Sequence, residues 1–159
     1  AIIKNDMEYI LMQRKPGGYR QPTAEQRKQS KISKNDFNDW FRQIWNITGA
    51  STKSPPAPFP LKLATRLVRM FSFSNDTVLD PFCGSGTTMI AALRNGRNSI
   101  GIDIDKEYCR MTARNLKTEI NDSSINSRLI FQKMANDSSG KMKICEDQSL
   151  YKVRTTKKV

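Results

Sequence analysis

The residues best suited to chemistry form one stretch, Asp80-Pro81-Phe82-Cys83-Gly84-Ser85-Gly86-Thr87. This stretch joins a short β-favouring run at 77–79 to a helix-compatible run at 87–95. A strand–loop–helix unit of this kind places a nucleotide-like ligand at the N-terminus of the helix. Gly84 and Gly86 leave room for a ligand to approach the backbone. An ordinary turn between a strand and a helix would need the same glycines, so the loop alone leaves both interpretations open.

A second strand ending in acids follows at 98–105, Asn-Ser-Ile-Gly-Ile-Asp-Ile-Asp. A carboxylate at the tip of a neighbouring parallel strand is how such folds bind the two hydroxyls of a ribose. We assign this role to Asp103 and the N-cap of the following helix to Asp105. A nicotinamide dinucleotide site requires Gly-x-Gly-x-x-Gly, but Met89 occupies the third glycine position. The pattern therefore favours a smaller adenosine ligand.

Three motifs resemble those of the S-adenosylmethionine-dependent DNA amino-methyltransferases: the loop at 80–88, the segment Pro56-Ala57-Pro58-Phe59-Pro60-Leu61 and the strand region 96–103. The resemblance covers about residues 8–120 and is to the permuted subgroup, in which the cofactor half follows the catalytic half. It implies an α/β, Rossmann-like methyltransferase fold of which this chain is the C-terminal, cofactor-binding half. It also implies methyl transfer from S-adenosylmethionine to the exocyclic amino nitrogen of adenine (N6) or cytosine (N4).

The same resemblance assigns roles to individual residues. Asp80 would anchor the methionine end of S-adenosylmethionine, and Phe82 would contact its adenosine. Gly84 and Gly86 would permit close approach of the cofactor, while Thr87 adds a hydroxyl at the start of the helix. The full expected cofactor-binding set is Asp80, Pro81, Phe82, Gly84, Ser85, Gly86, Thr87 and Asp103.

The family's catalytic tetrapeptide is Asp, Asn or Ser, then Pro-Pro, then an aromatic residue. The one Pro-Pro pair of this sequence follows Ser54 but precedes Ala57, which offers no ring to stack on a flipped base. We interpret this stretch as the entry to the next helix, where the family usually has a histidine that this sequence lacks. We therefore assign no catalytic residue and expect the tetrapeptide on a missing N-terminal half or on a second chain.

Two alternatives stay open. The chain could be a non-catalytic subunit that binds the cofactor or DNA, or a nucleotide-binding domain that uses another ligand. A Pro-Pro-aromatic tetrapeptide encoded upstream of Ala1 would favour the methyltransferase.

The composition points to a nucleic-acid partner. Lys and Arg give a net charge of +12, and they outnumber the acids in each third of the chain. Such an excess favours the phosphate backbone of double-stranded DNA, although a soluble surface has the same appearance. The absence of histidine, and three cysteines without metal-ligand spacing, argue against a structural zinc site and a histidine general base. Free cysteines suit a reducing cytoplasm, which the resemblance implies is that of a prokaryotic cell, and no apolar run is long enough to span a membrane.

We divide the chain into four regions. Residues 1–15 hold a strand, at 7–15, that belongs to the sheet of the missing half. Residues 16–53 hold a DNA-facing loop at 16–33 and a helix that Ser33 caps and Gly49 ends. Residues 54–120 are the S-adenosylmethionine-binding region. Residues 121–159 hold a short strand at 128–131 and a weakly ordered basic tail that includes 136–141 and 152–159.

Apolar spacing identifies the buried faces of the helices. The segment after Ser33 presents Phe37, Trp40, Phe41, Ile44 and Trp45, which we assign to the core rather than to base stacking. The helix before the loop presents Leu61, Ala64, Leu67, Val68 and Phe71 to the core, with Arg66 and Arg69 on other faces. A helix at 106–120 directs Cys109, Ala113, Leu116 and Ile120 inward. Without the missing half, the strand at 77–80 would be an exposed edge, which favours homo-oligomerisation.

Overall fold

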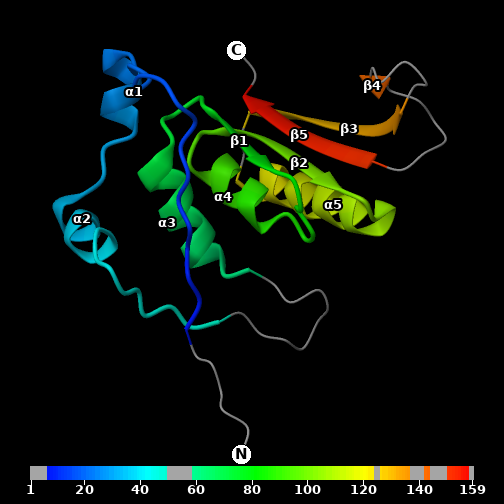
Figure 1. Ribbon diagram of the computed structural model, residues 1–159. Helices are drawn as coiled ribbons and strands as arrows, with labels where there is room; N and C mark the ends of the chain where they lie inside the picture. Colours follow the sequence, from blue (N-terminus) through cyan, green and yellow to red (C-terminus); the bar gives the residue numbers. More distant parts are fainter. Residues whose placement is uncertain (1–6, 50–58, 124–125, 137–141, 144–149, 158–159) are drawn as a thin grey trace, which may run out of the picture.

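The computed structural model describes residues 7–49, 59–123, 126–136, 142–143 and 150–157. Its centre is a five-stranded sheet with the order β1-β2-β5-β3-β4 (Figure 1). The strands are β1 (Thr77–Asp80), β2 (Asn98–Asp103), β3 (Ser127–Asn136), β4 (Met142–Lys143) and β5 (Leu150–Lys157). β1 and β2 are parallel, and β5 runs antiparallel between β2 and β3. This mixed sheet confirms the expected α/β class.

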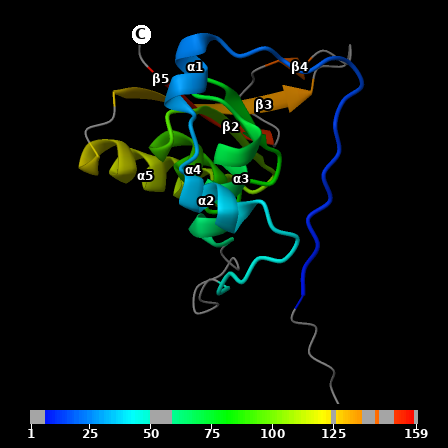
Figure 2. The same ribbon diagram turned by 90° about the vertical axis from the view of Figure 1, so that its left-hand side faces the viewer.

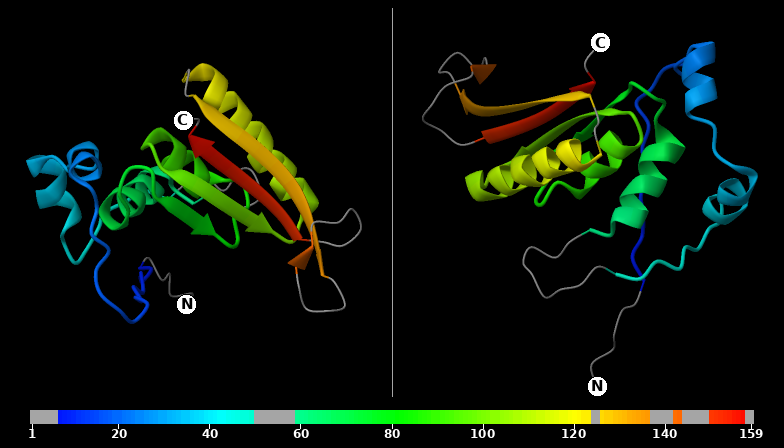
Figure 3. Two further views of the ribbon diagram at one scale, coloured as in Figure 1. Left: turned by 90° about the horizontal axis from the view of Figure 1, so that it is seen from above. Right: turned by 180° about the vertical axis from the view of Figure 1, so that it is seen from behind.

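Helices cover one face of the sheet. α4 (Thr87–Arg94) and α5 (Lys106–Asp122) lie against the strands, and α3 (Leu61–Phe71) packs on α4 (Figures 1 and 3). α2 (Lys34–Trp40) lies beside α3, and α1 (Ala24–Gln29) lies near the residues that precede β1 (Figure 2). Seen from above, the opposite face carries no helix among the described residues (Figure 3, left). The described part of the chain contains no helix with the length and apolar character needed to cross a membrane.

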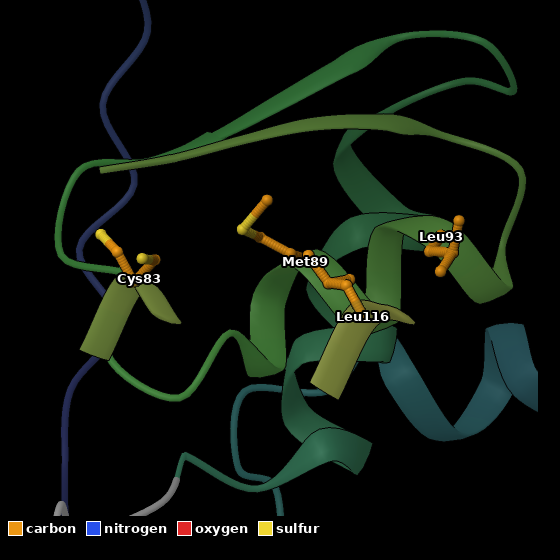
Figure 4. Packing of buried hydrophobic residues seen from close by; sticks show 5 residues of the cluster. Cys83, Met89, Leu93 and Leu116 are labelled. Atoms are coloured by element: carbon orange, nitrogen blue, oxygen red, sulfur yellow. The ribbon is translucent and has the colours of Figure 1, made fainter. Parts of the chain in front are cut away.

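The core forms where small residues of β2 meet α4 and α5. Ser99 is fully buried, and a Cβ on Gly101 would overlap the side chains of Met89 and Cys83. The helices can therefore approach the strand closely. The main cluster contains Cys83, Met89, Leu93, Cys109 and Leu116 (Figure 4), and Ala113, Ile120 and Leu129 pack against it. All four residues that we predicted to face inward from α5 thus contribute to the core.

The uncovered face of the sheet is apolar near β1. Leu79 pairs with Ile100 across the two parallel strands, and Ile100 and Ile130 both pair with Arg154 of β5. Because side chains alternate along a strand, the side chains of these three apolar residues point away from the helices. Leu79 is 58% exposed. β1 is also an edge strand in the described sheet, so both its backbone and its outer face are open.

The N-terminal segment differs from the expectation. Residues 7–15, predicted as a strand, have no regular secondary structure, and Tyr9 is 81% exposed. A strand forms only with a neighbour that satisfies its backbone hydrogen bonds, and none of the described strands pairs with this segment. The sequence pattern was strand-like, but the pairing partner that it requires is not among the described elements.

The segment predicted as a loop at 16–33 contains α1. Thr23 accepts a hydrogen bond from the backbone N–H of Gln26 (3.1 Å), and the Gln26 side chain accepts one from the backbone N–H of Thr23 (3.1 Å). This capping box stabilises a short helix that has no buried residue and therefore no apolar pattern.

α2 begins as predicted, because the Ser33 hydroxyl accepts from Asp36 N–H (3.0 Å), but it ends at Trp40 instead of Gly49. The Trp45 indole donates to the carbonyl of Trp40 (2.7 Å), which a continuing helix would have used for its own backbone. The predicted apolar stripe is consequently not core. Only Trp40 is buried, whereas Phe37 and Phe41 stack on each other at 4.4 Å and, like Ile44, are exposed.

α3 buries Ala64 and Val68 as predicted, but Phe71 is 58% exposed. Arg66, predicted to face elsewhere, is 3% exposed because Trp40 and Trp45 cover it. Its guanidinium lies 5.8 and 4.8 Å from the two ring centroids. Arg66 also donates to Asp39 (2.9 Å), and these contacts attach the segment around α2 to α3.

The prediction of a weakly ordered C-terminal tail is wrong for residues 152–157. They belong to β5, which lies between β2 and β3 in the sheet. The hydroxyls of Ser99 and Thr155 share a buried hydrogen bond of 2.5 Å that fixes β5 against β2. The predicted strand at 128–131 is part of the longer β3. The expectations for residues 54–58, 137–141 and 158–159 lie outside the described residues.

Candidate functional site

Residues 81–86, which we call the glycine loop, reverse the chain between β1 and α4. The Asp80 carboxylate accepts a hydrogen bond from the backbone N–H of Phe82 (3.1 Å), and Gly86 N–H donates to the carbonyl of Cys83 (2.7 Å). Gly84 and Gly86 have φ values of +49° and +86°. Residues with a side chain rarely adopt this left-handed conformation, so both glycines are required by the backbone itself.

Asp103 ties the loop to the tip of β2. One carboxylate oxygen accepts from Gly84 N–H and the other from Asp105 N–H, both at 2.9 Å. The parallel register of β1 and β2, which pairs Asp80 with Gly101, brings these segments together. The structure thus gathers the expected residues 80–87 and Asp103 at the carboxyl end of the two strands. Each carboxylate oxygen of Asp103 keeps a second lone pair that a ligand hydroxyl can use.

The helix α5 supports the loop on its other side. The Thr112 hydroxyl donates to the carbonyl of Gly84 (2.7 Å), and the Asn115 amide donates to the carbonyl of Ser85 (3.0 Å). Sequence reasoning missed both residues. Their spacing of three places them on one face of α5, but only the fold shows that this face meets the loop.

The N-terminus of α4 opens onto the loop. Gly86 is the N-cap and has no side chain to satisfy the first N–H groups of the helix. Ser85 and Thr87 place two hydroxyls beside them, 3.4 Å apart. Phe82 is 87% exposed, so its ring is accessible to a ligand. Such a helix terminus attracts a carboxylate or phosphate group.

Two buried thiols pack together here: Cys83, which belongs to the loop (Figure 4), and Cys109 of α5. The hydrogen bond from the Cys109 thiol holds the pKa of Cys83 below its ordinary value despite burial. The same interaction, together with burial, raises the pKa of Cys109. The Cys109 thiol also donates to the backbone carbonyl of Asp103 (3.9 Å). Among the described residues no three potential metal ligands come together.

Two cavities lie elsewhere, between α2 and α3. Their volumes are about 530 and 280 Å³, and Asp39, Lys62 and Arg66 line both. Neither cavity includes a residue of the glycine loop. These cavities lie where α2 and the residues after it pack against α3. The glycine loop and Asp103 lie at the carboxyl ends of β1 and β2 instead.

α1 is attached at the other end of β1. Gln26 donates to the carbonyl of Ser74 (2.9 Å), Ser74 N–H donates to the hydroxyl of Ser30 (2.7 Å), and Arg20 pairs with Asp76. Ser74 and Asp76 precede β1, while the glycine loop follows it. α1 therefore lies near the amino end of β1, opposite the loop.

Comparisons with known proteins agree with this geometry. The family model for the N6/N4 DNA methylases matches residues 3–114. The type II methyltransferase M.MthZI of Methanothermobacter thermautotrophicus is 37% identical over 148 residues, which are 86% of this chain and 41% of that protein. M.MjaI of Methanocaldococcus jannaschii is 45% identical over 113 residues, 67% of this chain and 37% of that protein.

A solved structure is also similar to this chain. The Thermus thermophilus protein TTHA0409, a putative DNA modification methylase crystallised with S-adenosyl-L-methionine, superimposes with a TM-score of 0.68 at 54% identity, covering 76% of this chain and 47% of that one. The chain belongs to the N6/N4 DNA methylase family and has its Rossmann-like methyltransferase fold. It spans less than half the length of the relatives named here.

The anchoring role of Asp103 generates a prediction for stability. Asp103→Ala removes the acceptor of two backbone N–H groups and should lower the free energy of unfolding by about 1.5–3 kcal/mol, the range for bonds to charged groups. Urea unfolding followed by circular dichroism measures this. Asp122→Ala, which removes an exposed acid at the end of α5, is the matched control and should change stability little. Equal stabilities of the two variants would contradict the anchoring role.

Proposed function

We propose that this chain binds S-adenosylmethionine at the glycine loop and forms the cofactor-binding part of a DNA amino-methyltransferase. The observation that carries the proposal is the convergence of Gly84, Gly86 and Asp103 at the ends of two parallel strands. The crystallised relative that holds S-adenosyl-L-methionine supports it.

Each part of the cofactor has a chemically suitable partner. The ribose hydroxyls would donate to Asp103, whose carboxylate lies at the tip of β2. The methionine end would meet Asp80, the hydroxyls of Ser85 and Thr87, and the free N–H groups of α4. Pro81 and Phe82 would form the apolar contact for the adenosine. The two glycines allow the backbone to come close to the ligand.

The reaction we propose is methyl transfer to the exocyclic nitrogen of adenine (N6) or cytosine (N4) in double-stranded DNA. The sulfonium of S-adenosylmethionine supplies an already activated methyl group. The residues of this chain would then hold the donor in place for in-line attack, which is catalysis by positioning. A base inside a duplex is out of reach, so the target nucleotide must be flipped out of the helix.

The basic region 16–53 is the proposed DNA-facing part. Arg27, Lys28, Lys31 and Lys34 are exposed there and can contact phosphates. α1 lies at the opposite end of β1 from the glycine loop, so its basic residues would position the duplex rather than read the target base. The net charge of +12 supports the same partner.

We further propose that the catalytic tetrapeptide is supplied by another segment, and that this segment docks at β1. The free edge of β1 and the exposed Leu79 offer backbone and apolar groups that an additional strand would cover. The alternative of a non-catalytic cofactor- or DNA-binding subunit requires the same cofactor loop but no such segment. A second copy of this chain on the same edge would give a homo-oligomer.

The cofactor assignment predicts selective stabilisation. S-adenosylmethionine should raise the melting temperature of the chain, and NAD should not, because the loop lacks the third glycine of a dinucleotide site. At one hundred times the dissociation constant the stabilisation should be about 2.7 kcal/mol. Thermal unfolding with each ligand tests this, and stabilisation by NAD alone would remove the assignment.

The ribose assignment predicts a loss of affinity. Asp103→Ala should weaken S-adenosylmethionine binding by roughly 10-fold or more, since hydrogen bonds to a charged group are lost. Isothermal titration calorimetry on the folded variant measures the change, with Asp122→Ala as control. An unchanged affinity would move the ribose role to another acid, with Asp105 as the next candidate.

The docking proposal predicts that the chain alone does not methylate DNA and gains activity when the tetrapeptide-bearing half of a relative is added. The assay is transfer of tritiated methyl groups to duplex DNA of mixed sequence. The control is the same half with alanine in place of its two prolines, which should restore no transfer. Efficient methylation by the purified chain alone would show that the catalytic residues lie within it.

A further inference from the structure

The loop carbonyls are held from one side by two side chains of α5. Thr112 and Asn115 donate to the carbonyls of Gly84 and Ser85, which are consecutive residues of the loop. Thr112 is fully buried, so its hydroxyl has no water to bind instead. Loss of the Thr112 hydroxyl would leave the Gly84 carbonyl without this donor, and an unsatisfied buried acceptor costs free energy.

This arrangement fixes the direction of one N–H group. In a trans peptide the C=O and the following N–H point in opposite directions. Because the Gly84 carbonyl points to Thr112, the N–H of Ser85 points away from α5. Within the described residues the Ser85 N–H has no hydrogen-bond acceptor. By contrast, the Gly84 N–H donates to the Asp103 carboxylate and the Gly86 N–H donates to the Cys83 carbonyl.

The helix α5 also packs closely against the glycine loop. A Cβ at Gly86 would lie 2.7 Å from the Thr112 methyl carbon, so the threonine occupies the space that a side chain would need. Thr112 therefore has two separable contributions, a methyl group that packs beneath Gly86 and a hydroxyl that orients the Gly84 carbonyl. Valine at this position retains the branched shape and removes the hydroxyl, which also lies 3.9 Å from the Cys83 sulfur.

We propose that Thr112 and Asn115 are positioning residues. Thr112 orients the Gly84–Ser85 peptide so that the Ser85 N–H faces the methionine end of the cofactor, and Asn115 holds the next peptide, between Ser85 and Gly86, in place. The inference rests on the proposed function. It assigns no ligand contact to either side chain, since both act through the loop. Adenosine alone, which lacks the methionine end, should be far less sensitive to them.

The test is calorimetry of the full chain with S-adenosylmethionine and with adenosine. Thr112→Val should weaken S-adenosylmethionine binding by roughly 3- to 10-fold, the effect of one hydrogen bond, and leave adenosine binding nearly unchanged. Thr112→Ser, which keeps the hydroxyl, should restore the affinity for S-adenosylmethionine. Asn115→Ala should act in the same direction as Thr112→Val and provides the test if the valine variant does not fold.

Matched controls come from the exposed side of the same helix. Thr118→Val and Asn121→Ala make the same chemical changes at exposed positions of α5 and should bind both ligands as the wild type does. Wild-type affinity in folded Thr112→Val and Asn115→Ala, or an equal loss for both ligands, would overturn the inference while leaving the proposed function intact. Failure of the wild type to bind S-adenosylmethionine would overturn both.

Discussion

The hydrogen bond between the Asp103 carboxylate and the Gly84 N–H is the interaction on which the site depends. It joins the loop after β1 to the tip of β2, and it does so only because the two strands are parallel and in register. The left-handed backbone at Gly84 and Gly86 then turns the chain into α4. An acid at this strand end is thus needed both to build the loop and, in our proposal, to hold the ribose.

Small residues of β2 allow the helices to pack closely on the sheet near this hydrogen bond. Gly101 and Ser99 let α4 and α5 approach β2, and that approach brings Thr112 within reach of the loop. On the opposite face of the sheet Leu79 is exposed and its neighbour Ile100 is half-buried. The described sheet therefore has one face covered by the helices that support the glycine loop. Its other face is partly exposed and apolar near β1, where our proposal places a further polypeptide segment. This asymmetry agrees with a chain that spans less than half of its relatives.

The sequence predicted the loop, the position of Asp103 at the end of β2, the N-cap role of Asp105 and the helices α3, α4 and α5, because each depends on local spacing and capping. The ribose role of Asp103 stays a prediction. Asp105 does accept from Glu107 N–H at the start of α5 (2.7 Å). The errors arose where distant segments decide the structure. β5 forms because β2 and β3 accept it as a neighbour. α2 ends where the Trp45 indole takes the carbonyl of Trp40, and both tryptophans pack on Arg66 of the separate helix α3. The support from Thr112 and Asn115 likewise joins residues about 30 positions apart, which no local pattern reveals.

The central claim is that the cofactor binds between the glycine loop and the tip of β2. The most direct measurement is a titration of the ¹⁵N-labelled chain with S-adenosylmethionine, followed by amide chemical shifts. We expect the largest changes at residues 82–88 and 103–105, with Ser85 among them. Shifts centred on Asp39, Trp40 and Arg66, around the cavities between α2 and α3, or no shifts at all, would contradict the claim.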